Sequence, residues 1–154
     1  MEGAYTLLIS TYKHNVDAKG RVFIPARWRN DLGDIIIVYR GIIKPDDVKC
    51  LFGMSLDEWT KFSQKLQSLS LGKMDAQRLI RKIFSGASEC EVDKTGRILL
   101  PQTLREYAGI EEEVVLNGMG KRIEIWNPAM YEYHDSLGDE LSDSALDALM
   151  ELGV

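Results

Sequence analysis

Apolar and polar positions follow the same order twice along the chain, at positions 76 residues apart. The first copy reads VDAKGRVFIP at 16–25, and the second reads VDKTGRILLP at 92–101. Each copy has Val-Asp, two variable residues, Gly-Arg, three apolar residues and Pro. The Asp and Gly are typical of a tight turn, and the apolar triplet is typical of a short strand. The pattern therefore predicts a duplicated turn-and-strand unit.

The likeness continues after the proline of each copy. PARWRNDLG at 25–33 matches PQTLREYAG at 101–109, and an apolar run follows in each copy. Pro suits the first turn of a helix and Gly suits its end, so a short helix is predicted between them. Further on, LFGMSLDEW at 51–59 matches IEIWNPAMY at 123–131. Each half is expected to run strand, turn, strand, short helix, strand, turn, strand, helix.

Longer helical patterns lie between the halves and at the C-terminus. A capping-box pattern, SLDE at 55–58, precedes apolar residues at helical spacing and predicts a helix that ends near Gly72. A second helix is predicted over 75–84. In the tail, 139–152, leucines share one face and acids the other, which predicts a peripheral acidic helix.

One half alone is too small to bury a core, because it holds only about four short strands and one small helix. The two halves are therefore expected to complete one another about a pseudo-twofold axis, in an intertwined α+β unit. We expect a single domain over 1–154. Its expected parts are a first half with its helix (5–72), a linking helix (73–87), a second half (88–138) and the acidic tail (139–154).

Composition places the chain among soluble globular proteins, with 45% hydrophobic and 28% charged residues. No apolar run reaches the roughly 20 residues that a membrane helix needs. The N-terminus lacks the basic region and the long apolar core of a secretory signal, so a cytoplasmic protein without a membrane partner is expected. Cys50 and Cys90 show no metal-binding spacing and are predicted to be buried thiols.

Charge is distributed unevenly, although the formal net charge is −5. Residues 123–154 hold eight acids and no Lys or Arg. The segment 13–29 holds one acid, Asp17, and five bases, and such a local field attracts a polyanion more than the net charge repels it. The five bases are Lys13, Lys19, Arg21, Arg27 and Arg29.

Patterns typical of enzymes are absent from the sequence. His14 and His134 have no second ligand at metal spacing and are interpreted as surface or capping residues. No GxSxG motif or Cys/His pair indicates a nucleophile. The stretch NGMGKR at 117–122 lacks the spacing of a phosphate loop and is predicted to be a hairpin turn. We therefore expect no enzyme activity, no cofactor, no metal and no small-molecule substrate.

The paired Asp-x-x-Gly-Arg motifs allow two interpretations. In the structural one, Asp17 and Asp93 build the turns and pair with Arg21 and Arg97. In the functional one, each carboxylate orients an arginine that binds guanine or phosphate. Spacing alone leaves both open. The first copy has more neighbouring bases and is expected to make the stronger contacts. Two small motif residues, Ala18 and Thr95, have no evident role, whereas three tryptophans are predicted to pack in the core: Trp28, Trp59 and Trp126.

These motifs resemble the MraZ family of bacterial transcriptional regulators. The resemblance also includes CLFGMSLDEW at 50–59, GASECEVDKTGRILLP at 86–101 and RIEIWNP at 122–128, and it extends from about residue 10 to residue 135. It implies the pseudo-twofold double swapped-hairpin β-barrel of AbrB-like regulators, formed by two duplicated halves of one chain with flanking helices.

The resemblance also implies a function. Such proteins form ring-like homo-oligomers, bind short direct repeats in double-stranded DNA upstream of the division and cell-wall gene cluster, and act mainly as repressors, so a nucleoid association is expected. The resemblance assigns DNA contact to the Asp and Arg of each motif, and the local charge adds neighbouring bases. The expected DNA-binding residues are Lys13, Asp17, Lys19, Arg21, Arg27, Asp93, Lys94 and Arg97.

A different class of function remains open. The amphipathic helices predicted over 55–71 and 139–152 could bind partners of the division apparatus. The chain would then be a protein-interaction scaffold, and its two turns would be purely structural.

Overall fold

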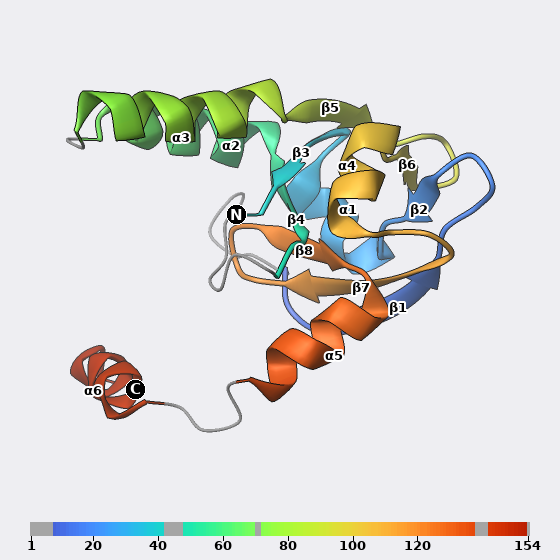
Figure 1. Ribbon diagram of the computed structural model, residues 1–154. Coiled ribbons are helices and arrows are strands. Elements are labelled where there is room, and N and C mark those ends of the chain that lie inside the picture. Colours follow the sequence, from blue (N-terminus) through green and yellow to red (C-terminus); the bar gives the residue numbers. More distant parts are fainter. Residues whose placement is uncertain (1–7, 42–47, 70–71, 138–141, 154) are drawn as a thin grey trace.

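The computed structural model describes residues 8–41, 48–69, 72–137 and 142–153 (Figure 1). Within these ranges the chain forms eight strands and six helices. The first half contains β1 (Thr11–Asn15), β2 (Arg21–Phe23), α1 (Ala26–Leu32), β3 (Ile35–Arg40), β4 (Leu51–Ser55) and α2 (Leu56–Gln67). The rest contains α3 (Lys73–Ser85), β5 (Ser88–Glu91), β6 (Arg97–Leu99), α4 (Gln102–Ala108), β7 (Glu113–Gly118), β8 (Ile123–Trp126), α5 (Pro128–Ser136) and α6 (Asp143–Glu151).

The order of elements confirms the duplicated pattern and the mixed α and β content. The Ser55 hydroxyl accepts a hydrogen bond from the Glu58 amide at 3.1 Å, which confirms the predicted helix start. The end of α2 at Gln67 falls short of the predicted Gly72, whereas α3 is longer than predicted. Of the predicted tail helix, residues 142–152 lie in the described part and 139–141 outside it.

The strands pair across the two halves. The main sheet is antiparallel and runs β1-β7-β8-β4-β3-β5. In it β1 of the first half pairs with β7 of the second, and β5 of the second half pairs with β3 of the first. The short strands β2 and β6 form a separate two-stranded ribbon. Within the described residues no pairing joins the sheet edges β1 and β5, so the closed barrel that the resemblance implies is not shown.

The β2–β6 ribbon lies at the centre of the duplication. Val22 pairs with Ile98, its own counterpart at the 76-residue offset, and both side chains are fully buried. On either side, the Ile24 amide donates to the Gly96 carbonyl at 2.9 Å, and the Leu100 amide donates to the Gly20 carbonyl at 3.0 Å. Each of these bonds is the counterpart of the other. The two halves therefore meet about a local pseudo-twofold axis.

Two apolar clusters cover the two faces of the main sheet. Trp28 lies in the cluster that includes the ribbon and α1, and Trp126 lies in the one that includes α2, α3 and α5. Both tryptophans are buried, as predicted. Trp59 is half-buried, with its ring centroid 5.1 Å from that of Tyr39 and 5.7 Å from that of Phe84. The apolar face of α2 is therefore largely occupied by its own chain.

Both cysteines are buried free thiols, as predicted. Burial raises the pKa of Cys90 to about 11 and shifts the pKa of Cys50 upward in the same way. The two histidines, interpreted as surface or capping residues, are both half-buried. The His134 ring stacks on Trp126 at 5.3 Å, and the His14 ring lies 5.8 Å from that of Phe23.

Two further features concern the helices. No helix in the described part of the chain has the length and apolar character needed to cross a membrane. The last helix, α6, lies apart from the rest of the chain, and all of its residues are exposed (Figure 1).

Candidate nucleic-acid interface

Each motif forms a tight turn that leads into one strand of the ribbon. In the first copy, Oδ1 of Asp17 accepts hydrogen bonds from the amides of Lys19 at 3.0 Å and Arg21 at 2.8 Å. The Gly20 amide donates to the Asp17 carbonyl at 2.9 Å, and Gly20 has a φ of 92°, a conformation that favours glycine. The second turn repeats this geometry with Asp93 and with Gly96 at a φ of 84°.

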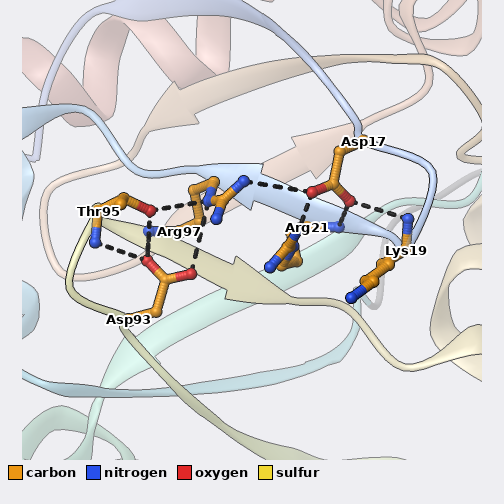
Figure 2. Close-up of polar contacts among 6 residues, drawn as sticks. All are labelled: Asp17, Lys19, Arg21, Asp93, Thr95 and Arg97. Atoms are coloured by element: carbon orange, nitrogen blue, oxygen red, sulfur yellow. Dashed lines mark hydrogen bonds and ion pairs between the residues drawn. The ribbon is translucent and has the colours of Figure 1, made fainter.

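The Asp17 carboxylate also holds both motif arginines. Its Oδ2 contacts both Nε of Arg21 and Nη1 of Arg97 (Figure 2), at distances of 2.6 Å and 3.3 Å. The pKa of Asp17 falls from its ordinary value of 3.8 to about 2, first because of the Arg21 amide and then because of the Arg21 guanidinium. One ionised carboxylate thus links the two halves at the surface.

The second motif orients its arginine differently. Nε of Arg97 donates to the Thr95 hydroxyl at 2.8 Å, and that hydroxyl donates to Oδ1 of Asp93 at 2.8 Å (Figure 2). The direct contact of Arg97 Nε with Oδ2 of Asp93 is longer, at 3.5 Å. The Arg97 amide and the Thr95 hydroxyl lower the pKa of Asp93. The interpretation of Thr95 as a residue without a role is therefore wrong.

A second pair of arginines lies behind the turns. Nε of Arg29 donates to the Ile24 carbonyl at 3.0 Å, and its guanidinium lies against Gly96 of the other half. Its counterpart Arg105 donates to the Leu100 carbonyl at 2.9 Å and lies against Gly20. A Cβ atom at either glycine would overlap these guanidinium groups. The alignment of the two copies matched these arginines but gave no sign that each supports the opposite turn.

The outward face of the ribbon alternates guanidinium and apolar groups. Arg21 pairs with Leu99, and Phe23 pairs with Arg97, while the intervening pair points into the core. Phe23 and Leu99 are large apolar side chains left exposed, and both arginines are about one-third exposed. The guanidinium of Arg29 lies 4.7 Å from the Phe23 ring centre. This face can offer hydrogen bonds, positive charge and apolar contact together.

Some of the other predicted site residues lie beside this face of the ribbon, and others lie elsewhere in the fold. Lys19 and Lys94 are exposed within the two turns, beside the ribbon. Arg27 is exposed on α1, outside the ribbon. Lys13 pairs with Val115, whose side chain packs in the cluster on the opposite face of the main sheet. The structure thus brings together Asp17, Lys19, Arg21, Asp93, Lys94 and Arg97, and it does not bring Lys13 to the same face.

The exposed arginines and lysines of this face suit an anionic ligand. Among the described residues, no three His, Cys, Asp or Glu side chains gather where they could hold a metal ion. A two-stranded ribbon can enter the major groove of B-DNA, and a guanidinium can donate to both O6 and N7 of guanine. Arginine and lysine also bind phosphate oxygens. We therefore regard the β2–β6 ribbon as a candidate nucleic-acid interface.

Comparison with known proteins identifies relatives of the whole chain. The family model described as "MraZ protein, putative antitoxin-like" matches residues 7–82 and again residues 83–150. The protein named transcriptional regulator MraZ from Thermoanaerobacter pseudethanolicus is 41% identical over 148 residues, which cover 96% of this chain and 100% of that protein. The one from Caldicellulosiruptor bescii is 49% identical over 121 residues, covering 79% and 81% of the two chains.

A third relative of the same name, from Caldicellulosiruptor saccharolyticus, is 44% identical over 149 residues, covering 96% of this chain and 100% of its own. Among solved structures, that of PHS018 from Pyrococcus horikoshii covers 76% of this chain and 86% of its own, at 17% identity and a TM-score of 0.32. That likeness is too slight to bear on the fold. The match of both halves to one family model and the close relatives show that this chain belongs to the MraZ family, whose named members are transcriptional regulators and not enzymes.

Proposed function

We propose that this chain regulates transcription by binding double-stranded DNA through the outward face of the β2–β6 ribbon. One observation carries the proposal: two arginines, oriented by ionised carboxylates, lie on an exposed two-stranded ribbon between the halves. The names of the relatives support a regulatory role. The ribbon would be the part that reads the target.

The two kinds of basic residue would act differently. Asp17 holds Nε of Arg21, and within the described residues nothing bonds to the two terminal amino groups of Arg21. These amino groups would donate to O6 and N7 of a guanine. Lys19 and Lys94 are exposed in the turns and would bind phosphates without regard to sequence. Asp17 and Asp93 would be positioning residues, because they act on DNA only through the arginines.

We propose the finer features of the family for this chain as well. The exchange of β1 and β5 between the halves supports a double swapped-hairpin fold in one domain over 1–154. One ribbon offers few phosphate contacts, so a single chain would bind weakly. A ring-like homo-oligomer would place several ribbons on short direct repeats and gain avidity. The repeats would lie upstream of the division and cell-wall gene cluster, and occupancy would repress it by excluding polymerase at the nucleoid.

The test is a binding titration on the duplex upstream of the chain's own gene and on a scrambled duplex of equal length, at several salt concentrations. Arg21→Ala should weaken specific binding by about 1–3 kcal/mol, roughly 5- to 150-fold, and should weaken scrambled binding less. Arg97→Ala should have a smaller effect, because Nη1 of Arg97 is already bonded to Asp17. Arg78→Ala, on the exposed surface of α3, is the matched control and should change little.

Two results would contradict the proposal. Equal losses on both duplexes for Arg21→Ala would exclude base reading by that residue. Wild-type protein that binds neither duplex would favour the scaffold alternative. Of the two helices assigned to that alternative, α2 packs its aromatic side chains against the sheet, so only α6 has its apolar face uncovered among the described residues.

A further inference from the structure

The C-terminal helix α6 is amphipathic, and nothing in this structure covers it. Its apolar side includes Leu146, Leu149 and Met150, which are 39%, 47% and 69% exposed. Beside them three acids follow at four-residue spacing: Asp143, Asp147 and Glu151. An isolated helix of nine residues is marginal in water, because nucleation costs more than so few hydrogen bonds return. A surface complementary to this helix would therefore be apolar in the middle and basic at the edge.

A groove of that kind lies between α2 and the β7–β8 turn. It has a volume of about 340 Å³, and Met54 and Phe62 form its apolar part. Among its other lining residues are one acid, Glu58, and four bases: Lys61, Lys65, Lys121 and Arg122. Lys61 lies 3.7 Å from Glu58 and from its neighbour Asp57 on α2.

Two of the three remaining bases of the groove lack comparable partners. Lys65 and Lys121 are exposed and form no ion pair within the described residues. The third base, Arg122, has Nη2 3.9 Å from Oε2 of Glu124, while its Nε is buried without a hydrogen-bond partner in the same part of the chain. Its guanidinium lies 4.3 Å from the Phe52 ring centre. The groove therefore carries an excess of positive charge beside an apolar floor.

We propose that α6 of one copy docks in this groove of a second copy. The leucine side of the helix would cover Met54 and Phe62, and Asp147 and Glu151 would face Lys65 and Lys121. Charge complementarity supports this pairing, since residues 123–154 contain no Lys or Arg to oppose the groove. The inference rests on the proposed self-assembly, and it names the contact that would build the assembly.

The second copy is the chosen occupant because α6 lies apart from the body of its own chain (Figure 1). The helix and the groove are different surfaces of one molecule, so each copy would offer its helix to the next and its groove to the one before. Such a head-to-tail contact closes into a ring when its rotation divides a full turn. The geometry of this contact would then set the size of the ring.

The test reverses charges on each side and measures mass without DNA by sedimentation velocity. The tail variant is Asp147→Lys with Glu151→Lys, and the groove variant is Lys65→Glu with Lys121→Glu. Each alone should raise the concentration for half-assembly roughly tenfold or more, because two attractive pairs become repulsive. An equimolar mixture of the two variants should assemble like the wild type, because each altered helix then meets an altered groove.

Lys94→Glu is the control, since it reverses an exposed charge on the ribbon turn. It should leave the mass unchanged while weakening DNA binding. The docking proposal is overturned if the wild type is monomeric, if neither variant changes the mass, or if mixing fails to restore it. The variants and their mixture could change the mass as expected while the wild type binds no DNA. That result would refute the proposed function and leave the docking proposal intact.

Discussion

The two ribbon turns share their backbone course, their Asp, Gly and Arg, and their place about the pseudo-twofold axis. They differ at both variable motif positions: Ala18 stands opposite Lys94, and the next position bears on the arginines. There the first turn has Lys19 and the second has Thr95. The threonine hydroxyl lies between Asp93 and Arg97, so the second arginine reaches its own carboxylate mainly through another side chain. In the first turn Arg21 contacts Asp17 directly.

The difference between Lys19 and Thr95 makes the two motif arginines unequal. The Asp17 carboxylate contacts both motif arginines, whereas the Asp93 carboxylate contacts the Arg97 guanidinium alone. Arg97 is bonded at Nε and at Nη1, whereas Arg21 is bonded at Nε alone within the described residues. Of the two duplicated arginines, Arg97 is therefore the more restrained, and Arg21 is the more available for DNA. The expectation that the first copy makes the stronger DNA contacts stays a prediction, and this difference supports it.

Substitution of the glycine that both turns share should destabilise the protein most. Gly20→Ala and Gly96→Ala should each lower the free energy of unfolding by about 1–3 kcal/mol, because φ is positive at both sites and a Cβ overlaps the arginine of the opposite half. Urea unfolding measures the change. Adding Arg105→Ala should reduce the penalty at Gly20 and leave that at Gly96 as it was. Equal penalties in both backgrounds would show that the arginine contact is unimportant.

A second prediction concerns an exchange of Lys19 and Thr95 between the two turns. The double substitution Lys19→Thr with Thr95→Lys keeps the net charge and transfers the hydroxyl to the first turn. Arg97→Ala should then become the costlier arginine substitution for specific DNA binding, by roughly the several-fold margin that Arg21→Ala holds in the wild type. Titration of both alanine variants in the exchanged background measures this. An unchanged ranking would mean that position 19 or 95 does not control the arginines.

The carboxylates should differ in their effect on pH dependence. The folded pKa of Asp17, about 2, lies below its ordinary value of 3.8. The ionised group therefore stabilises the fold above about pH 4, and this contribution disappears as the pH falls toward 2. Asp17→Asn should flatten the pH dependence of the urea midpoint across this window. Asp93→Asn should also flatten it, but less, because Asp93 makes no contact with the other motif's arginine. The reverse ranking would contradict the role of Asp17 in linking the halves.

The smallest effect is expected at an exposed base. Lys19→Ala should weaken specific and scrambled binding alike and reduce the slope of log K against log salt by about 0.9, because one phosphate is no longer neutralised. Thr95→Ala should leave this slope unchanged, because the hydroxyl carries no charge. Binding isotherms at several salt concentrations would distinguish the two variants. A weakening confined to the specific duplex would instead assign base reading to Lys19.

Much of this fold could be predicted from short stretches of sequence. The Asp and Gly of each motif determine a turn through local hydrogen bonds and a positive φ, and both turns form as predicted. A hairpin turn was predicted at 117–122, and residues 119–122 connect the paired strands β7 and β8. Apolar spacing likewise predicted the helices and the burial of Trp28 and Trp126. Each of these features depends on residues close together in the chain.

Other features depend on residues far apart, and the sequence did not reveal them. Local spacing could not show that β1 pairs with β7, that Arg29 lies against Gly96, or that Arg97 reaches Asp17 across the ribbon. It also grouped Lys13 with the turn, although the pairing of β1 places its side chain on the other face of the sheet. The order of the elements and the form of each turn follow from neighbouring residues, so short stretches of sequence were enough to predict them. Which half supports which turn depends on how the two halves pack together, so this could be seen only in the folded chain.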